Sequence, residues 1–166
     1  MSRHALVLTI SDGVSAGTRQ DESGAALCAR LTELGFTVER QTVPDEMDEI
    51  ATAISGATGH AALVISTGGT GLGPRDVTPQ TMRGLLDYEI PGFGEQMRAF
   101  GRSGTPMADL SRSLAGVLAS TLVVAVPGSK GGALDSLAAI EPLLDHALET
   151  LGGHTQHGTA GEVSKP

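Results

Sequence analysis

The chain contains 166 residues, with 11 Lys and Arg against 19 Asp and Glu, so its formal net charge is −8. This length fits one domain with its own hydrophobic core. The acidic balance argues against broad binding to nucleic acid, whose phosphate backbone requires a basic surface. Hydrophobic residues make up 40% and charged residues 18% of the chain, which excludes a disordered protein.

The cysteine content and the length of the apolar runs bear on the compartment. Cys28 is the single cysteine, so no internal disulfide can form. No charged and then apolar leader precedes the first strand pattern, and apolar runs such as 122–126 are far shorter than the roughly 20 residues of a membrane helix. We therefore expect a cytoplasmic protein without a membrane span, in which Cys28 is a small core residue.

The first two predicted elements are a buried strand and an amphipathic helix. Residues 4–10 (HALVLTI) form a continuous apolar run that ends in the turn residues 11–13 (SDG), which predicts a buried strand feeding a loop. From Ser23 to Leu34, apolar side chains fall on one helical stripe, and Gly35 follows as a stop.

An edge strand and a second helix come next. Residues 37–43 (TVERQTV) are β-branched but polar, as in a strand at the edge of a sheet. A helix is predicted from Asp45 to about Thr58. Asp45 is its expected N-cap, and Asp48 is expected in the first turn, where the helix dipole favours a carboxylate.

The third apolar run leads into the longest glycine-rich segment. Residues 61–67 (AALVIST) predict another buried strand, which continues directly into GGTGLGPRD at 68–76. A helix follows, with Thr78 as its expected N-cap and Pro79 at its first position.

The last third of the chain ends with a clear strand and a long helix. Residues 91–115 mix Gly, Pro and Ser with short helical pieces and few apolar residues, so no single element is assigned there. Residues 121–126 (TLVVAV) predict a buried strand, followed by PGSKGG at 127–132. The final helix carries leucines at helical spacing, with Asp135 near its start at the favourable dipole end, and stops at Gly152.

The alternation of strands and helices defines the fold class. The pattern predicts a single three-layer α/β domain over residues 1–153, with a mostly parallel sheet covered by helices on both faces. The polar remainder, residues 154–166, is expected to be a flexible tail.

Three glycine-bearing loops indicate where the chemistry lies. Residues 11–13, 68–76 and 127–132 each follow an apolar strand, and ligands of parallel sheets bind at the carboxyl ends of the strands. Glycine lets backbone N–H groups approach phosphate oxygens, although in any one loop it can simply make a tight turn. The fingerprints of P-loop nucleotidases and of dinucleotide oxidoreductases are absent, so neither class is supported.

A series of motifs in fixed order gives the chain a family resemblance. They are TISDG at 9–13, DESG at 21–24, PDE at 44–46, TGGTG at 67–71 with RDVTP at 75–79, PGF at 91–93, LSR at 110–112 and PGSK at 127–130. Together they resemble the MogA/MoaB family of molybdenum cofactor biosynthesis proteins, which includes molybdopterin adenylyltransferases and the G domain of gephyrin. The similarity extends over residues 5–151.

The resemblance implies an enzyme that transfers AMP from ATP to the terminal phosphate of molybdopterin and releases pyrophosphate, with Mg²⁺ as cofactor. Two anionic reactants require backbone donors, cations and metal-binding carboxylates, which these loops offer. The resemblance also implies a homotrimer and a hand-off to a molybdate-inserting MoeA-like protein. Two alternatives stay open: a MoaB-type protein that binds molybdopterin or its precursor without catalysis, and a partner-anchoring domain as in gephyrin.

The resemblance assigns catalysis to two aspartates. Asp76, in the Arg-Asp-x-Thr motif, and Asp45, in the Pro-Asp-Glu motif, are the expected catalytic residues and Mg²⁺ ligands. Each has a structural alternative, because Asp76 could cap a local turn and Asp45 could cap a helix.

Substrate contacts are expected from all three loops and from the LSR motif. The residues expected to bind molybdopterin or ATP phosphates are Ser11, Asp12, Gly13, Thr67, Gly68, Gly69, Thr70, Gly71, Arg75, Thr78, Ser111, Arg112, Pro127, Gly128, Ser129 and Lys130. Arg75 could pair a phosphate through its planar fork or form a surface salt bridge. Ser129 and Lys130 would present a hydroxyl and a positive charge to phosphate at the start of the last helix.

Overall fold

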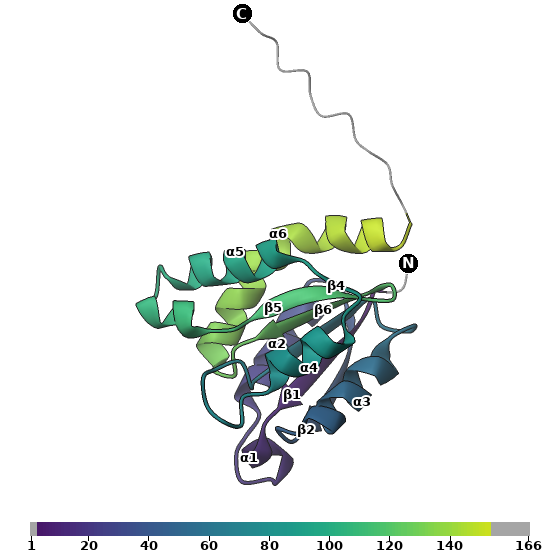
Figure 1. The fold of residues 1–166 in the computed structure, drawn as a ribbon. Helices are drawn as coiled ribbons and strands as arrows, with labels where there is room; N and C mark the ends of the chain where they lie inside the picture. The colour runs from purple at the N-terminus through teal and green to yellow at the C-terminus, as the bar shows by residue number, and fades with distance from the viewer. Residues whose placement is uncertain (1–2, 154–166) are drawn as a thin grey trace, which may run out of the picture.

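Six strands form one sheet between two layers of helices. The computed structural model describes residues 3–153, and Figure 1 shows how its helices enclose the sheet. The strands, in the order β2-β1-β3-β6-β5-β4 across the sheet, span β1 His4–Ile10, β2 Thr37–Val43, β3 Leu63–Thr67, β4 Tyr88–Glu89, β5 Leu114–Leu118 and β6 Thr121–Val126. The four strands β2, β1, β3 and β6 are parallel, and β5 runs antiparallel to both of its neighbours.

Helices cover both faces of this sheet. They are α1 Asp12–Ser15, α2 Glu22–Glu33, α3 Met47–Ala57, α4 Thr78–Leu85, α5 Pro91–Gly101 and α6 Lys130–Leu151, with a 3-10 helix, η1, over Pro106–Leu110. The buried side chains of α2, α5 and α6 belong to one core cluster, and those of α3 and α4 belong to the other. The three-layer α/β architecture with a mostly parallel sheet is therefore confirmed.

Strand β1 shows why the central strands have continuous apolar sequences. Its Ala5 and Val7 belong to the cluster on the α2 side, whereas Leu6, Leu8 and Ile10 belong to the cluster on the α3 side. Successive side chains of a strand point to opposite faces, so a strand covered on both faces needs an apolar residue at nearly every position. Strand β2 lies at the edge of the sheet and is mostly exposed, as its polar sequence predicts.

The bounds of most strands match the sequence patterns, but the two strands β4 and β5 were not predicted. The predicted strands at β1, β2 and β6 have the observed bounds, and β3 begins two residues later than predicted. The unassigned segment 91–115 contains the full helix α5, the 3-10 helix η1 and the start of β5. Gly116 interrupts the apolar run of β5, and a Cβ there would overlap the backbone of Tyr88, so the close pairing of β4 with β5 requires this glycine.

The expected caps of two helices and the expected place of Asp135 in a third helix are corrected. Helix α3 begins two residues after Asp45, which is therefore not its N-cap, whereas Asp48 lies in the first turn as expected. Val77 precedes α4 as the cap residue, and Thr78 is already inside the helix. Asp135 lies beyond the first turn of α6. The side chains of Asp45 and Thr78 are used instead to hold the loops at the carboxyl ends of the strands.

The remaining expectations concern Cys28, membrane-spanning helices and the C-terminal tail. Cys28 packs against the core from α2, and burial raises the pKa of its thiol, as expected for a core residue. Within residues 3–153, no helix has the length and apolar character needed to cross a bilayer. The expected tail, residues 154–166, lies outside the described residues.

Candidate functional site

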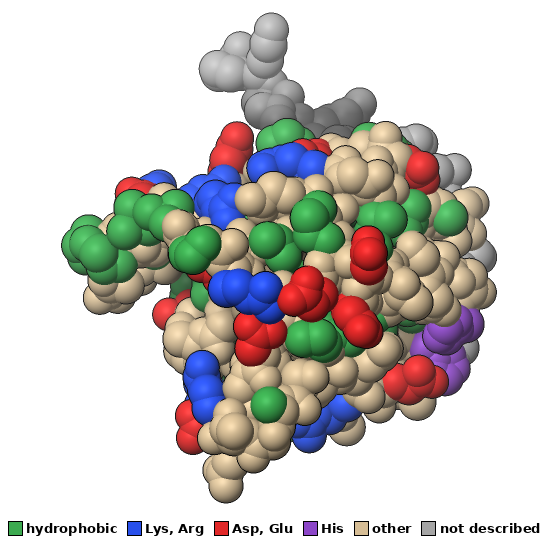
Figure 2. Space-filling view, turned by 60° about the horizontal axis from the view of Figure 1, so that its bottom comes forward, with side chains coloured by type: hydrophobic (Ala, Val, Ile, Leu, Met, Phe, Trp, Pro, Cys, Tyr) green, Lys and Arg blue, Asp and Glu red, His purple; other side chains and the backbone are tan. Residues whose placement is uncertain are grey.

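The loops after four parallel strands meet at one edge of the sheet. Strands β1, β2, β3 and β6 all end at this edge, and each continues into a loop that carries expected site residues. Figure 2 turns this edge toward the viewer and shows acidic and basic side chains side by side across it. The expectation that the three glycine-bearing loops open onto one edge is therefore confirmed.

A cavity of about 520 Å³, named here the loop cavity, lies between these loops. The expected site residues that line it are Ser11, Asp45, Thr67, Gly68, Gly69, Asp76, Gly128, Ser129 and Lys130. Residues 19–23, around the start of α2, complete one wall. Residues from four separate loops are thus brought together in one polar cavity.

A second cavity of about 490 Å³, named here the side cavity, adjoins the loop cavity. Gly69, Asp76 and Gly128 line both. The side cavity is lined further by the expected site residues Thr70, Gly71, Ser111 and Pro127 and by the apolar side chains of Leu72, Met107 and Leu110. A polar cavity and a partly apolar one therefore meet at a wall that contains one carboxylate, that of Asp76.

The glycines around Asp76 shape its position. The Asp76 carboxylate accepts a hydrogen bond from the backbone N–H of Gly73 through Oδ2 at 2.8 Å. A Cβ at Gly71 would lie 2.8 Å from the same oxygen and a Cβ at Gly73 would lie 2.9 Å from it, so a side chain at either position would displace the carboxylate. Asp76 therefore closes a local turn and lines both cavities at the same time.

Asp12 and Asp45 join the loops after β1 and β2. Oδ2 of Asp45 accepts from the backbone N–H of Asp12, and Oδ1 of Asp12 accepts from the backbone N–H of Asp45, each at 2.9 Å. Burial raises the pKa of the Asp45 carboxyl, and the negative charges of Asp12 and Asp76 add to this shift. Asp45 is therefore a carboxylate whose ionised form would be stabilised by a cation in the cavity.

Arg75 forms a salt bridge at the rim of the site. Its Nε and Nη2 donate to the two carboxylate oxygens of Asp12, each at 3.1 Å, and Nη2 also donates to Glu46 at 2.9 Å. The Asp12 and Glu46 carboxylates raise the pKa of the guanidinium, and Arg75 lowers the pKa of Asp12 in turn. The expected site residues that line neither cavity are Asp12, Gly13, Arg75, Thr78 and Arg112.

Arg112 holds the loop that carries Asp76. Its Nε donates to the carbonyl of Gly71 at 2.8 Å, and its Nη2 donates to the carbonyl of Asp76 at 2.6 Å. Its Nη1 donates to Gln80 at 3.2 Å, and its backbone N–H donates to the carbonyl of Thr70 at 2.9 Å. The guanidinium thus clamps both ends of the turn, and it lines neither the loop cavity nor the side cavity.

Replacement of Arg112 by lysine is expected to lower the free energy of unfolding by about 1–3 kcal/mol, because one ammonium group cannot replace a fork that serves two carbonyls and an amide. Urea unfolding measures this change. Arg102→Lys is the matched control, since Arg102 forms only an exposed pair with Asp109 and is expected to change stability by less than about 0.5 kcal/mol. Equal stability of the two variants would show that Arg112 is not a clamp.

Two buried threonines from the motifs use their hydroxyl groups to hold the loops together. The Thr78 hydroxyl donates to the carbonyl of Gly68 at 2.9 Å. The Thr67 hydroxyl donates to the carbonyl of Pro127 at 2.8 Å and thereby ties β3 to the loop after β6. Both side chains therefore position the glycine-bearing loops.

Asp21 is a candidate site residue to which the sequence patterns assign no role, although its DESG motif is a signal that could have found it. It lines the loop cavity. Its Oδ2 accepts from the hydroxyl of Thr9 at 2.7 Å and from Arg40 at 2.8 Å, and its Oδ1 accepts from the N–H of Gly24 at 2.9 Å. Burial raises the pKa of Asp21, but these three donors outweigh it and the net shift is downward.

The lowered pKa of Asp21 predicts a pH-dependent contribution to stability. Because the pKa is lower in the folded than in the unfolded chain, the contribution is complete above the unfolded value of about 3.9 and is lost as pH falls through the folded value. Asp21→Asn is expected to be about 1–3 kcal/mol less stable than the wild type at pH 7. Urea unfolding at pH 7 and at decreasing acidic pH checks whether this difference shrinks; a difference independent of pH would contradict the assignment.

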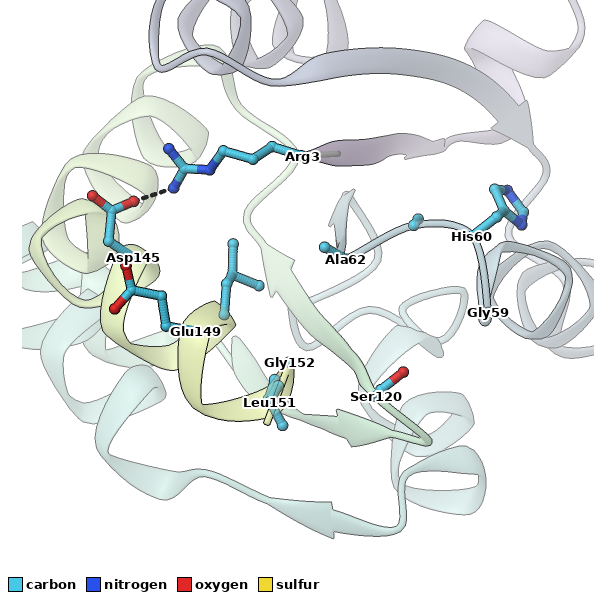
Figure 3. Close-up of a pocket in the computed structure, with 11 residues that line it drawn as sticks. Arg3, Gly59, His60, Ala62, Ser120, Asp145, Glu149, Leu151 and Gly152 are labelled. Atoms are coloured by element: carbon cyan, nitrogen blue, oxygen red, sulfur yellow. Dashed lines mark hydrogen bonds and ion pairs between the residues drawn. The ribbon is translucent and has the colours of Figure 1, made fainter. Parts of the chain in front are cut away.

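A third cavity, of about 470 Å³, lies at the opposite, amino-terminal end of the parallel strands. Figure 3 shows Arg3 facing Asp145 and Glu149 of α6, with His60 and Ser120 across the cavity. Arg3 is ion-paired with Asp145 and lies over the ring of Phe36, 4.7 Å from its centroid. Among the described residues that line this cavity, none belongs to the three glycine-bearing loops. The loop cavity is therefore the better candidate site.

Fold and site together define a parallel-sheet α/β protein whose glycine-bearing loops form a polar cavity suited to phosphate-bearing ligands. The sequence profile described as "Probable molybdopterin binding domain" matches residues 6–146. The chain belongs to this family, the MogA/MoaB family of molybdopterin-binding proteins.

Individual relatives agree with this assignment. The molybdopterin adenylyltransferase of Helicobacter pylori is 34% identical over 158 residues, which cover 91% of this chain and 89% of that protein. The molybdenum cofactor biosynthesis bifunctional protein of Synechococcus elongatus is 43% identical over 157 residues, or 93% of this chain and 49% of the relative. The chain spans about half the length of such bifunctional relatives.

Solved structures of the family share the fold. The molybdopterin biosynthesis enzyme MoaB from Thermus thermophilus is 42% identical, with a TM-score of 0.85 over 90% of this chain and 96% of that one. A molybdopterin biosynthesis protein from Mycobacterium abscessus is 36% identical, with a TM-score of 0.86 over 92% of this chain and 98% of that one.

Proposed function

We propose that the protein is a molybdopterin adenylyltransferase. The observation that carries the proposal is the junction of the loop cavity and the side cavity at Asp76. A transfer between two substrates requires that both are held with their reacting atoms at one point, which two adjoining cavities with a common wall allow. The names of the relatives in Helicobacter pylori and Escherichia coli, both molybdopterin adenylyltransferases, support the proposal.

In the proposed reaction, an oxygen of the terminal phosphate of molybdopterin attacks the α-phosphorus of ATP. The new P–O bond forms as the bond to the β-phosphate breaks, and pyrophosphate leaves. The chain contributes position and charge rather than a covalent bond: the glycine-bearing loops bring backbone groups close to the phosphates, and Lys130 offers a positive charge at the start of α6. The hydrogen bonds from Gly73 and Arg112 fix Asp76 and its loop for this step.

Asp45 and Asp76 fit a requirement for Mg²⁺. Within residues 3–153, no three His, Cys, Asp or Glu side chains converge as a complete metal site. Mg²⁺ commonly takes one or two carboxylates and completes its shell with substrate phosphates and water, so these two residues would hold it together with ATP. The raised pKa of Asp45 reflects burial and crowded negative charge, which a cation would relieve. When bound, the ion would neutralise phosphate charge.

Assembly and compartment belong to the same proposal: a cytoplasmic homotrimer that passes its product to a MoeA-like protein. Phe100, Met107 and Leu110 on α5 and η1 are 41%, 61% and 51% exposed, and Figure 2 shows hydrophobic side chains at the projecting end where these elements lie. A patch of exposed apolar side chains such as this one favours self-association of the protein. Light scattering is expected to give about three times the chain mass of 16.9 kDa; a monomer mass at working concentration would contradict the trimer.

Reconstitution with purified components tests the proposed activity. The protein is incubated with molybdopterin, ATP and Mg²⁺, and adenylylated molybdopterin and pyrophosphate are quantified by chromatography. We expect both products in equal amounts and neither when Mg²⁺ is chelated. Binding of molybdopterin without any product would favour the non-catalytic MoaB-type alternative instead.

A further inference from the structure

Two cations in the loop cavity have no partner within the described part of the protein. Of the 11 Lys and Arg residues, Lys165 lies outside that part of the chain. Eight of the others donate to a carboxylate or carbonyl oxygen: Arg3, Arg30, Arg40, Arg75, Arg83, Arg98, Arg102 and Arg112. Within residues 3–153, only the side chains of Arg19 and Lys130 have no such partner, and both line the loop cavity.

The loop between α1 and α2 holds the backbone of Arg19 in a defined place. The carbonyl of Gly13 accepts from the N–H of Thr18 at 2.9 Å, from the N–H of Arg19 at 3.1 Å and from the Thr18 hydroxyl at 3.1 Å. The turn is made by Gly17, whose φ of +74° suits glycine. A Cβ at Gly13 would lie 2.9 Å from Cδ of Arg19, so the glycine leaves room for the arginine stem beside it.

Lys130 reaches the same cavity from the loop after β6. It is the first residue of α6, and the preceding Ser129 caps the helix by accepting from the N–H of Gly132 at 3.2 Å. The ammonium group therefore adds a full charge to the partial positive charge of the helix N-terminus. Arg19 and Lys130 thus bring two positive charges to one cavity from segments far apart in the sequence.

The other charges of the cavity explain why these cations matter. Asp21, Glu22, Asp45 and Asp76 line the same space and would repel an anionic ligand. Asp21 is paired with Arg40, and the rim arginine Arg75 is occupied by Asp12 and Glu46. Arg19 and Lys130 are therefore the cationic side chains of this cavity that are available to attract a phosphate-bearing ligand.

We infer that Arg19, together with Lys130, binds a phosphate group of the ligand in the loop cavity. The inference rests on the proposed function for the nature of that ligand, and it adds a binding residue from outside the loops and motif residues to which substrate contacts were assigned. Both proposed substrates carry a phosphate group that could bind here: ATP at its pyrophosphate end, and molybdopterin at its terminal phosphate. A guanidinium suits either, because its planar fork pairs phosphate oxygens bidentately.

Calorimetric titration with inorganic pyrophosphate tests the inference without requiring turnover. Wild type, Arg19→Ala, Arg19→Lys and Arg102→Ala are compared after thermal melting has confirmed that each is folded. We expect Arg19→Ala to bind about tenfold more weakly, equivalent to the loss of about 1.4 kcal/mol, and Arg19→Lys to recover part of the affinity. Arg102→Ala removes an exposed salt bridge with Asp109 that does not line the cavity, and we expect it to match the wild type.

The same titration with molybdopterin distinguishes the two sources of phosphate. A loss confined to pyrophosphate assigns Arg19 to the nucleotide, and a loss confined to molybdopterin assigns it to the pterin substrate. Unchanged affinity of Arg19→Ala for both ligands, or no binding of either ligand by the wild type, would overturn the inference. Because these are binding measurements, weakened binding by Arg19→Ala in a protein that forms no adenylylated product would contradict the proposed function alone.

Discussion

Replacement of Asp76 by asparagine is expected to reduce the rate of adenylyl transfer by on the order of 100-fold or more. The asparagine amide oxygen can still accept the hydrogen bond from Gly73, so the turn and the stability of the protein should be retained. What is lost is the negative charge at the wall that the two cavities share, and with it the proposed metal ligand. The measurement is the rate of pyrophosphate release at saturating ATP and molybdopterin.

A matched control for Asp76→Asn comes from helix α3. Asp48 is an exposed carboxylate in the first turn of that helix and lines neither the loop cavity nor the side cavity. Asp48→Asn removes the same charge from the same edge region, and we expect full activity. Comparable rates for wild type, Asp48→Asn and Asp76→Asn would remove Asp76 from the mechanism.

Replacement of Gly68 by alanine is expected to have the largest effect on stability, about 3 kcal/mol or more. Gly68 has a φ of +109°, a backbone conformation that residues with a side chain rarely adopt. A Cβ at this position would also overlap the backbone carbonyl oxygen of Ile10, which belongs to β1 and cannot move without breaking the sheet. Urea unfolding followed by circular dichroism measures the loss, and activity should fall with it because the loop carries the cavity wall.

The control for Gly68→Ala is a glycine with open space around it. Gly56 lies in α3, and a Cβ there would meet no atom within 4 Å. Gly56→Ala is expected to raise the free energy of unfolding by about 0.5–1 kcal/mol, because alanine loses less backbone freedom on folding into a helix. If Gly68→Ala and Gly56→Ala both changed the free energy of unfolding by the same small amount, the close approach of Gly68 to Ile10 would not matter for stability.

Much of the sheet could be predicted because its strands are buried on both faces. The bounds of β1 and β6 follow from their largely apolar sequences, since nearly every position must be apolar between two helical layers. The antiparallel strand β5 could not be found in this way. Its central Gly116 interrupts the apolar run. The need for this glycine comes from its close contact with β4, which is only two residues long.

The position of the loop cavity was predictable to a similar degree. Glycine-bearing loops after apolar strands indicate the edge of the sheet at which this cavity lies, because parallel strands share one carboxyl edge. The partners of the long side chains could not be predicted, since they come from distant segments: Arg112 clamps a carbonyl 36 residues away, and Arg75 pairs with an aspartate 63 residues away. For the same reason, nothing in the sequence singles out Arg19 as a cation without a partner.

The central claim is that the loop cavity and the side cavity hold the two substrates on either side of Asp76. A crystal structure of the protein with Mg²⁺, molybdopterin and the α,β-methylene analogue of ATP tests it most directly, because this analogue cannot release pyrophosphate. The account predicts that the α-phosphorus lies beside Asp76, at the wall common to the two cavities. An α-phosphorus located elsewhere, for example in the cavity lined by Arg3 and His60 at the opposite end of the sheet, would contradict it.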